Sequence, residues 1–536
     1  MSFVIELDQG GRAFMASTDP DHPPRALAAV LVCAGVVLVN LDLFIVNVAM
    51  PSLADTWSDA SLADLSWVLN AYTVVFAALL VPAGRLSDRI GHRRAFLAGI
   101  AVFTVASALC AASPTLAVLV IARLIQAVGA ALLMPASLGL LLTSYPPERR
   151  GTVIRAWAAI GGLAAALGPV LGGLLLEPGW RWVFLVNLPI GVFTLVLGAR
   201  RLPDPAPTDR GPLPDLLGAA LLTAAIGALS LGVVRAPDWG WSAGRTVGVW
   251  VLTLLFAAGF LLRNARHPRP VVEGALVRNR TYAVSGIANT LFGVAFAGML
   301  ISGSMWMQTV WGWSALRTGL GTVPGPLCVP FVSILAGRYV ARFGPGPLVL
   351  VGGLSFGAGL GWWIVRLEPH AHYASDLLPG SILTGIGVGL ILPTLIATAT
   401  GALTPDRFAT GSGVITMLRQ VGSALGVAVF VAAVGAPATL DGYDRAWYIL
   451  GGATLLTATA ALFLPRQGRD AGAGGSGVRG SEGSEGSGGS GGSDGSRALG
   501  DAVRGSTAGA GAGASGGSVR DAATAAGAGA GAAPGA

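Results

Sequence analysis

The chain contains no lysine, and only 11% of its 536 residues carry a charge. Soluble domains are about 25% charged, so this scarcity excludes a water-soluble globular protein. The three cysteines, Cys33, Cys110 and Cys328, lie inside apolar runs without metal-like spacing, which indicates small buried side chains. Motifs of ATP hydrolysis and of hydrolytic catalysis are also missing. We therefore expect no enzyme, no nucleotide-driven motor, no metal site and no bound cofactor.

The chain does contain a series of long apolar runs, and 53% of its residues are hydrophobic. A helix needs about 20 mostly apolar residues to cross a bilayer. The fourteen runs of this kind are 26–49, 65–83, 95–113, 115–142, 152–176, 183–200, 213–234, 246–262, 283–310, 316–337, 346–366, 377–400, 411–435 and 445–464. The seventh and eighth are the weakest, so twelve spans remain an alternative. The sequence thus predicts an all-α integral membrane protein.

The arginines alternate along the connectors between these runs. Most connectors that follow an even-numbered run are arginine-rich, whereas the first connector carries only Asp55, Asp59 and Asp64. Because arginine is enriched in cytoplasmic loops, we expect the even-numbered connectors and both termini to be cytoplasmic. The net charge of +7 is spread along the connectors. A nucleic-acid binder would gather that charge on one soluble face, so no nucleic-acid partner is expected.

One basic connector has an unusual composition. Residues 84–94 read Gly-Arg-Leu-Ser-Asp-Arg-Ile-Gly-His-Arg-Arg. Two glycines permit a tight reversal, the acid can face a helix N-terminus, and the arginines suit an anionic membrane surface. The residues expected to set this geometry are Gly84, Asp88, Arg89, Gly91 and Arg93.

The same connector recurs later in the chain, where 337–344 matches 84–91 in both glycines and both arginines. Ala341 replaces Asp88, so the second copy keeps the expected turn and loses the acid. Such a repeat indicates two parallel six-helix halves. The expected organisation is an N-terminal cytoplasmic segment at 1–25, a six-helix bundle at 26–200, two spacer helices at 213–262, a second bundle at 283–464 and a Gly/Ser/Ala-rich disordered tail at 466–536.

Two charged residues lie inside apolar runs. Asp42 is in the first run and Arg123 in the fourth, and each needs a partner or a hydrated cavity within a membrane. Burial raises the pKa of a carboxyl group and a nearby cation lowers it, so such an aspartate can carry a proton. Asp42 is the best-placed acid to neutralise Arg123. The alternatives are that the carboxylate merely joins two helices and that Arg123 is a structural anchor.

The fifth run contains Gly168-Pro169-Val170-Leu171-Gly172-Gly173. Small residues allow helices to approach closely, and Pro169 removes one backbone hydrogen bond and bends the helix. By itself the pattern is a helix-packing motif.

Together, these motifs resemble the major facilitator superfamily and, within it, the fourteen-helix drug:proton antiporters. Residues 84–94 resemble its connector between helices 2 and 3, and 40–51 its first-helix signature. Arg123, Gln126 and Gly129 match the fourth-helix signature, although Ala127 replaces a usual glycine. The motif at 168–173 resembles the antiporter signature, which is associated with exporters. Further matches at 180–191, 316–324 and 412–426 extend the resemblance over 26–465.

The resemblance implies the major facilitator fold, with two six-helix bundles and two spacer helices. It implies proton-coupled efflux of hydrophobic or amphipathic small molecules, such as antibiotics, across a bacterial cytoplasmic membrane. The proton gradient would supply the energy, and Asp42, Arg123 and Gln126 would couple proton to substrate. The expected partners are a small molecule, protons and the lipid bilayer, with the chain acting as a monomer.

Cavity walls are predicted from aromatic, methionine and amide side chains, which adapt to varied ligands. The candidates are Asn70, Asn289, Phe292, Phe296, Met299, Trp306 and Gln308. Two other functions remain open. One is a dedicated exporter of a single metabolite, and the other is a membrane scaffold or sensor that transports nothing.

Overall fold

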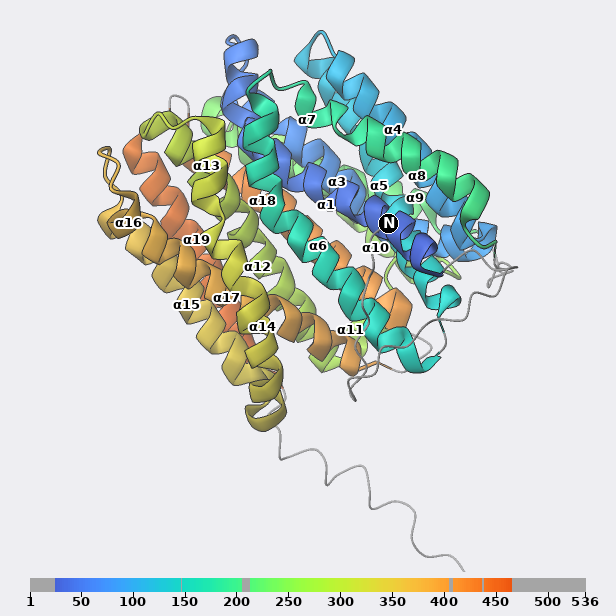
Figure 1. Cartoon of the computed structure of the whole chain (residues 1–536). Coiled ribbons are helices and arrows are strands. Elements are labelled where there is room, and N and C mark those ends of the chain that lie inside the picture. The colour runs from blue at the N-terminus through green and yellow to red at the C-terminus, as the bar shows by residue number, and fades with distance from the viewer. Residues whose placement is uncertain (1–24, 146, 205–212, 404–407, 436–437, 465–536) are drawn as a thin grey trace, which may run out of the picture. The chain divides into compact units, whose positions relative to one another are not determined.

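The computed structural model describes residues 25–145, 147–204, 213–403, 408–435 and 438–464. Within these ranges every regular element is a helix (Figure 1), which confirms the predicted all-α class. The helices of the first half are α1 (Arg25–Thr56), α2 (Leu62–Leu65), α3 (Trp67–Ile90), α4 (His92–Ala112), α5 (Leu116–Ser144), α6 (Pro147–Leu176), α7 (Trp182–Leu185) and α8 (Asn187–Arg201). The predicted tail at 466–536 and residues 1–24 of the N-terminal segment lie outside the described residues.

The remaining helices include the two predicted spacers and the second half. They are α9 (Leu216–Trp239), α10 (Gly244–Arg266), α11 (Gly274–Arg278), α12 (Arg280–Met305), the π-helical turn η1 (Trp306–Val310), α13 (Ala315–Thr322), α14 (Pro324–Phe343), α15 (Pro345–Arg366), α16 (Tyr373–Asp376), α17 (Leu378–Gly401), α18 (Phe408–Val434) and α19 (Leu440–Ala461).

Twelve helical segments of the described residues are long and apolar enough to cross a membrane. The spacers α9 and α10, predicted as the weakest spans, are among them. The predicted fifth and fourteenth spans are not. Only part of α6 is described in side-chain detail, and α19 carries Asp441, Asp444 and Arg445 in its first two turns. The count of fourteen therefore stays a prediction.

Helices from each half pack mainly with their own half. In the first half α1 packs on α6, and α5 packs on α3 and α4. In the second half α12 packs on α18 and α19, and α15 packs on α17 and α19. In Figure 1 the blue-to-teal helices and the yellow-to-orange helices accordingly form neighbouring groups.

Three contacts make up most of the junction between the halves, and they define what we call the seam. Helix α3 packs on α18, α6 packs on α13, and the spacer α9 lies against both α3 and α18. Figure 1 shows α6 alongside α13 and α14. The other spacer, α10, packs chiefly on α9 and exposes leucines such as Leu254 and Leu255, as expected of a helix that faces lipid.

The repeated connector is a helix end in both copies. Gly91 follows α3 with φ 96°, and Gly344 follows α14 with φ 81°. Only glycine adopts such angles at low cost, so these two residues make the predicted reversals. Gly84 and Gly337, however, lie inside α3 and α14, so their predicted part in the turn was wrong. Glycine costs only about 1 kcal/mol within a helix, so it does not have to end one.

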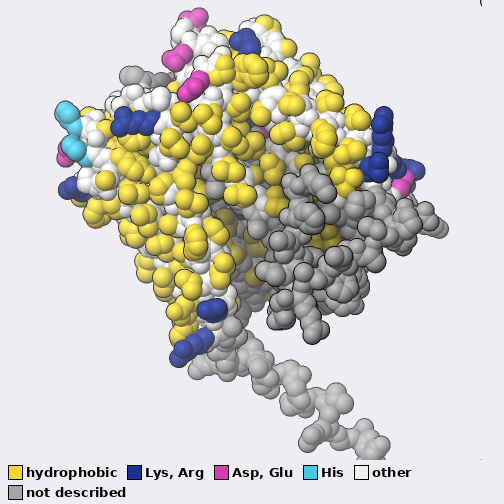
Figure 2. Space-filling model, viewed as in Figure 1, with side chains coloured by type: hydrophobic (Ala, Val, Ile, Leu, Met, Phe, Trp, Pro, Cys, Tyr) yellow, Lys and Arg dark blue, Asp and Glu magenta, His cyan; other side chains and the backbone are white. Residues whose placement is uncertain are grey.

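The predicted alternation of the connectors has a structural counterpart. Arg85, at the end of α3, donates from Nη1 to the carbonyl oxygen of Pro270 over 2.6 Å. Nδ2 of Asn279 donates to the carbonyl oxygen of Ala402 over 2.9 Å. The connectors that follow runs 2, 8 and 12 therefore meet at one end of the bundle. Figure 2 shows a broad apolar face with charged side chains at its margins, which suits a membrane-embedded surface.

Candidate functional site

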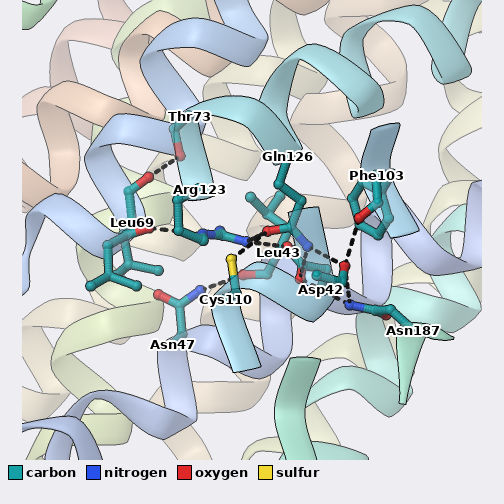
Figure 3. Close-up of polar contacts among 12 residues, drawn as sticks. Asp42, Leu43, Asn47, Leu69, Thr73, Phe103, Cys110, Arg123, Gln126 and Asn187 are labelled. Carbon is teal, nitrogen blue, oxygen red and sulfur yellow. Dashed lines mark hydrogen bonds and ion pairs between the residues drawn. The ribbon is translucent and has the colours of Figure 1, made fainter. Parts of the chain in front are cut away.

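The acid of α1 and the arginine of α5 are in direct contact. Nη1 of Arg123 donates to Oδ2 of Asp42 over 2.5 Å (Figure 3). The same nitrogen donates to Oε1 of Gln126, one turn further along α5, over 2.6 Å. Nε2 of Gln126 donates back to Oδ1 of Asp42 over 2.9 Å, so both carboxylate oxygens accept hydrogen bonds. The three residues predicted to couple proton and substrate thus form a closed triangle.

Two residues that the sequence analysis did not select complete this polar cluster. Nδ2 of Asn187, the first residue of α8, lies 3.3 Å from Oδ1 of Asp42 and 3.3 Å from Oγ of Ser107. Ser107 lies on α4 and accepts from Nε2 of Gln126 over 2.9 Å. The cluster therefore ties together α1, α4, α5 and α8. A small polar side chain inside an apolar run is the sequence signal for Ser107, whereas Asn187 also lies within the stretch 180–191 that resembles the family.

The guanidinium group of Arg123 has further partners on α3. Its Nε donates to the carbonyl oxygen of Val68 over 3.0 Å. Its charge lies over the ring of Tyr72, 4.1 Å from the centroid, and 5.9 Å from the centroid of Phe184. Carboxylate, carbonyl and ring faces all compensate a buried cation. The charge of Arg123 is therefore compensated by residues of the first half alone.

The polar cluster is sealed from solvent. Asp42, Arg123, Gln126, Ser107 and Asn187 all have 0% exposed surface. A buried ion pair is tolerated only with good geometry and additional hydrogen bonds, and this cluster supplies both. Nη2 of Arg123 and Oδ1 of Asn187 have no partner among the described residues, so one donor nitrogen and one acceptor oxygen of the cluster are unpaired. A proton can reach Asp42 only if the surrounding helices separate.

The glycines of the 168–173 motif mark close helix contacts. A Cβ atom at Gly168 would lie 2.6 Å from Cβ of Phe44, and one at Gly172 would lie 3.3 Å from the backbone of α1. A Cβ atom at Gly173 would lie 2.5 Å from Cα of Leu316 on α13. One face of the motif therefore packs on the helix that carries Asp42, and another face packs on the opposite half.

Helix α6 continues through Pro169 to Leu176. The carbonyl oxygen of Pro169 lies against Gly319 of α13, where a Cβ atom would clash with it. Glycine on α13 is thus required for the same contact that Gly173 permits from α6. The motif forms part of the seam.

The other members of the basic connector bind neighbouring helix ends. Nη2 of Arg93 donates to the carbonyl oxygen of Ala199 at the end of α8 over 2.5 Å. Oδ1 of Asp88 lies 3.9 Å from Nε2 of His92, so the acid lies beside the side chain of the first residue of α4. Arg89 is half-buried in the last turn of α3. The connector holds α3, α4 and α8 together at one end of the first half.

The cavity candidates differ in burial. Asn70, Asn289, Phe292 and Trp306 are at most 2% exposed, whereas Phe296, Met299 and Gln308 are half-buried. Asn289 donates from Nδ2 to the carbonyl oxygen of Ile415 over 2.8 Å and so joins α12 to α18. Gln308 donates to the carbonyl oxygen of Val48 over 3.1 Å and so joins η1 to α1. These two amides act as links between helices in this conformation.

The buried aromatic candidates belong to ring clusters. Phe292 packs edge-on against Phe356 with 5.3 Å between centroids, and Trp306 packs against Tyr443 at 5.1 Å and Trp447 at 5.3 Å. Asn70 has both amide atoms buried without a partner among the described residues. The described residues include no group of three His, Cys, Asp or Glu side chains placed to hold a metal ion.

Comparisons with known proteins agree with this architecture. The model of the Major Facilitator Superfamily matches residues 32–427. The tetracenomycin C resistance and export protein of Streptomyces glaucescens is 35% identical over 404 residues, which are 74% of this chain and 74% of that protein. The puromycin resistance protein of Streptomyces alboniger is 33% identical over 473 residues, which are 84% of this chain and 93% of that protein. A D-xylose-proton symporter superposes with a TM-score of 0.58 at 14% identity, over 82% of this chain and 98% of that chain, and so has the same fold.

Proposed function

The chain belongs to the major facilitator superfamily and is a transporter rather than an enzyme, and from that premise we propose that it exports hydrophobic or amphipathic small molecules, such as antibiotics, in exchange for protons. Relatives that cover most of its length are resistance and export proteins, which supports the direction. The proposed location is the cytoplasmic membrane of a bacterium, with both termini in the cytoplasm. The proposed partners are the substrate, protons and lipid, with one chain as the working unit.

The observation that carries the proton-coupled part is the sealed contact between Asp42 and Arg123. The carboxylate of Asp42 has 0% exposed surface and accepts hydrogen bonds from a cation and two amides, so water does not reach it in this conformation. If α1 moves relative to α5, the carboxylate loses its compensating charge and gains water, so it can take up a proton. The proton gradient can then drive transport, because Asp42 takes up a proton on only one side of the membrane.

Contacts of α1 connect this chemistry to the movement of the halves. Phe44 lies two residues after Asp42 and packs against Gly168 of α6. Helix α6 in turn packs on α13 across the seam through Gly173. When the halves rock about the seam, α6 has to slide on α13, and its contact with α1 transmits the shift. Alternating access and protonation are thus linked by three packed helices.

The test is proton-driven flux of puromycin in proteoliposomes with an imposed pH gradient. We expect Asp42→Asn to abolish gradient-driven flux and to keep binding, because the amide preserves the shape of the side chain but holds no exchangeable charge. Asp59→Asn is the matched control, since Asp59 is exposed in the first connector. Unchanged gradient-driven flux in Asp42→Asn would move the coupling site elsewhere.

The same assay separates the two other candidate functions. A dedicated metabolite exporter would transport one compound class and ignore unrelated antibiotics. A scaffold or sensor would show no gradient-driven flux of any compound, although the chain would be correctly inserted. Collapse of the flux by a protonophore would distinguish proton exchange from facilitated diffusion.

A further inference from the structure

A second arginine lies inside the helical bundle without a partner. Arg419 lies on α18, and its guanidinium group forms no hydrogen bond, ion pair or ring contact with any described residue. The residue is half-buried, and its nitrogens, unlike Nη2 of Arg123, are not sealed off. The position therefore carries a charge, and a water-sized molecule can reach it.

The accessible surface around Arg419 does not face lipid. No side chain described between 410 and 435 of α18 is exposed, because the helix is enclosed by α3, α9, α12, α17 and α19. Ser412, Thr416, Arg419 and Ser423 are all half-buried and are spaced by four, three and four residues. This spacing puts them on one face of the helix. Arg419 thus belongs to a polar stripe that faces the interior of the molecule.

The long helices around Arg419 contain few acidic residues. No aspartate or glutamate occurs at 280–366, 378–401 or 408–434, which include α12, η1, α13, α14, α15, α17 and α18. A cation inside a membrane protein has to be hydrated or matched by an anion. Arg123 is matched by Asp42, but Arg419 forms no ion pair with any described residue, and the acids of α16 and α19 lie in the short helix α16 and the first two turns of α19.

We propose that Arg419 binds an oxyanion of the exported molecule, a carboxylate or a phenolate, and so gives the transporter a preference for anionic amphiphiles. The proposal rests on the export function proposed above and names its substrate class. A guanidinium group binds two oxygens of a planar oxyanion in parallel, which favours an acid over an uncharged molecule.

Neighbouring hydroxyl groups on the stripe can assist the arginine. Oγ1 of Thr416 donates to the carbonyl oxygen of Ser412 over 2.9 Å, and Oγ of Ser423 donates to that of Arg419 over 3.1 Å. Both bonds lie within α18, so either hydroxyl can turn towards a bound oxyanion without breaking a contact between helices. The apolar part of the ligand would then lie against half-buried residues of the interior.

The experiment compares two dyes that share the xanthene ring system and differ in charge. Fluorescein is an anion in weakly alkaline buffer and rhodamine 6G is a cation, and fluorescence anisotropy reports the binding of each to the purified full-length chain. We expect Arg419→Gln to weaken fluorescein binding by about ten-fold or more, because it removes a charge-assisted pair. Rhodamine binding should stay within about two-fold or become tighter, because no pair is lost and a repelling charge is removed.

Two further variants serve as controls. Arg419→Lys keeps the charge and loses the planar fork, so fluorescein binding should fall less than in Arg419→Gln. Arg445→Gln removes one positive charge from an exposed position on α19 and should change neither dye. A melting curve for each variant shows whether the fold is intact.

Several outcomes would overturn the assignment. These are equal loss of both dyes in Arg419→Gln, unchanged fluorescein binding in that variant, or absence of fluorescein binding by the parent chain. The proposed function is tested separately by gradient-driven efflux of the bound dye. If the chain binds fluorescein through Arg419 but does not transport it, the assignment of the site stands and the export function is refuted.

Discussion

The two halves of the molecule accommodate an interior arginine in opposite ways. In the first half Arg123 is fully buried and is held by a carboxylate, an amide, a carbonyl and an aromatic ring. In the second half Arg419 is half-buried and has no partner among the described residues. A compensated charge links the helices around it and cannot lose its partner without cost, whereas an uncompensated one remains available to a ligand. This contrast is the basis of the coupling role proposed for the first half and of the recognition role proposed for the second.

The largest expected effect comes from removing each arginine in turn. Arg123→Leu leaves Asp42 buried without a cation, which should lower the free energy of unfolding by about 3–5 kcal/mol. Arg419→Leu removes a charge that has no partner, so stability should be unchanged or higher. Unfolding in detergent, followed by tryptophan fluorescence, measures both. Equal destabilisation by the two variants would break the comparison.

The next prediction concerns the seam that the halves share. Gly173→Ala places a methyl group 2.5 Å from backbone Cα of Leu316, so the seam has to open at a cost of about 1–3 kcal/mol and flux should fall. Gly357→Ala on α15 is the matched control, because nothing lies within 4 Å of its Cβ position. Wild-type flux and stability in Gly173→Ala would show that the seam is not close-packed in the transporting protein.

The repeated turn offers a test in which the halves should behave alike in stability. Gly91 and Gly344 both have positive φ, so replacement of either by alanine should cost about 1–2 kcal/mol. Unfolding of the two single variants measures this, with Gly84→Ala as a control inside α3. Flux should fall more for Gly91→Ala, since its connector also carries Asp88 and Arg93. A large difference in stability would show that the two turns are not equivalent.

The smallest effect is expected from a single buried hydroxyl in each half. Ser302→Ala removes the acceptor of the Trp447 indole N–H, which lies 3.0 Å away, at a cost of about 1 kcal/mol. Ser107→Ala should cost somewhat more, about 1–3 kcal/mol, because it removes an acceptor shared by Gln126 and Asn187. Thermal midpoints of the purified variants provide the measurement. Reversed order would mean that the polar cluster re-forms around alanine.

Much of the site could be predicted because its members are expensive in a membrane. An aspartate and an arginine inside apolar runs need each other, so Asp42 and Arg123 could be paired without coordinates. Ser107 and Asn187 could not be selected, since small polar residues are common in membrane helices and cost little there. The burial of Phe292 and Trp306 could not be predicted either, because an aromatic side chain suits a cavity wall and a helix interface alike.

Sequence alone determined the helical class, the repeated connector and the family, because apolar run length, glycine at a turn and motif spacing are local properties of a chain. It also determined that α12, α14, α15, α17 and α18 contain no acid, although that absence acquires meaning only in the fold. Tertiary structure decided which residues share the polar cluster, that Gly84 lies within a helix, and that α6 packs across the seam on α13. Those outcomes depend on how helices rotate and pack against one another, and hydrophobic periodicity constrains the buried face of a helix without specifying its neighbour.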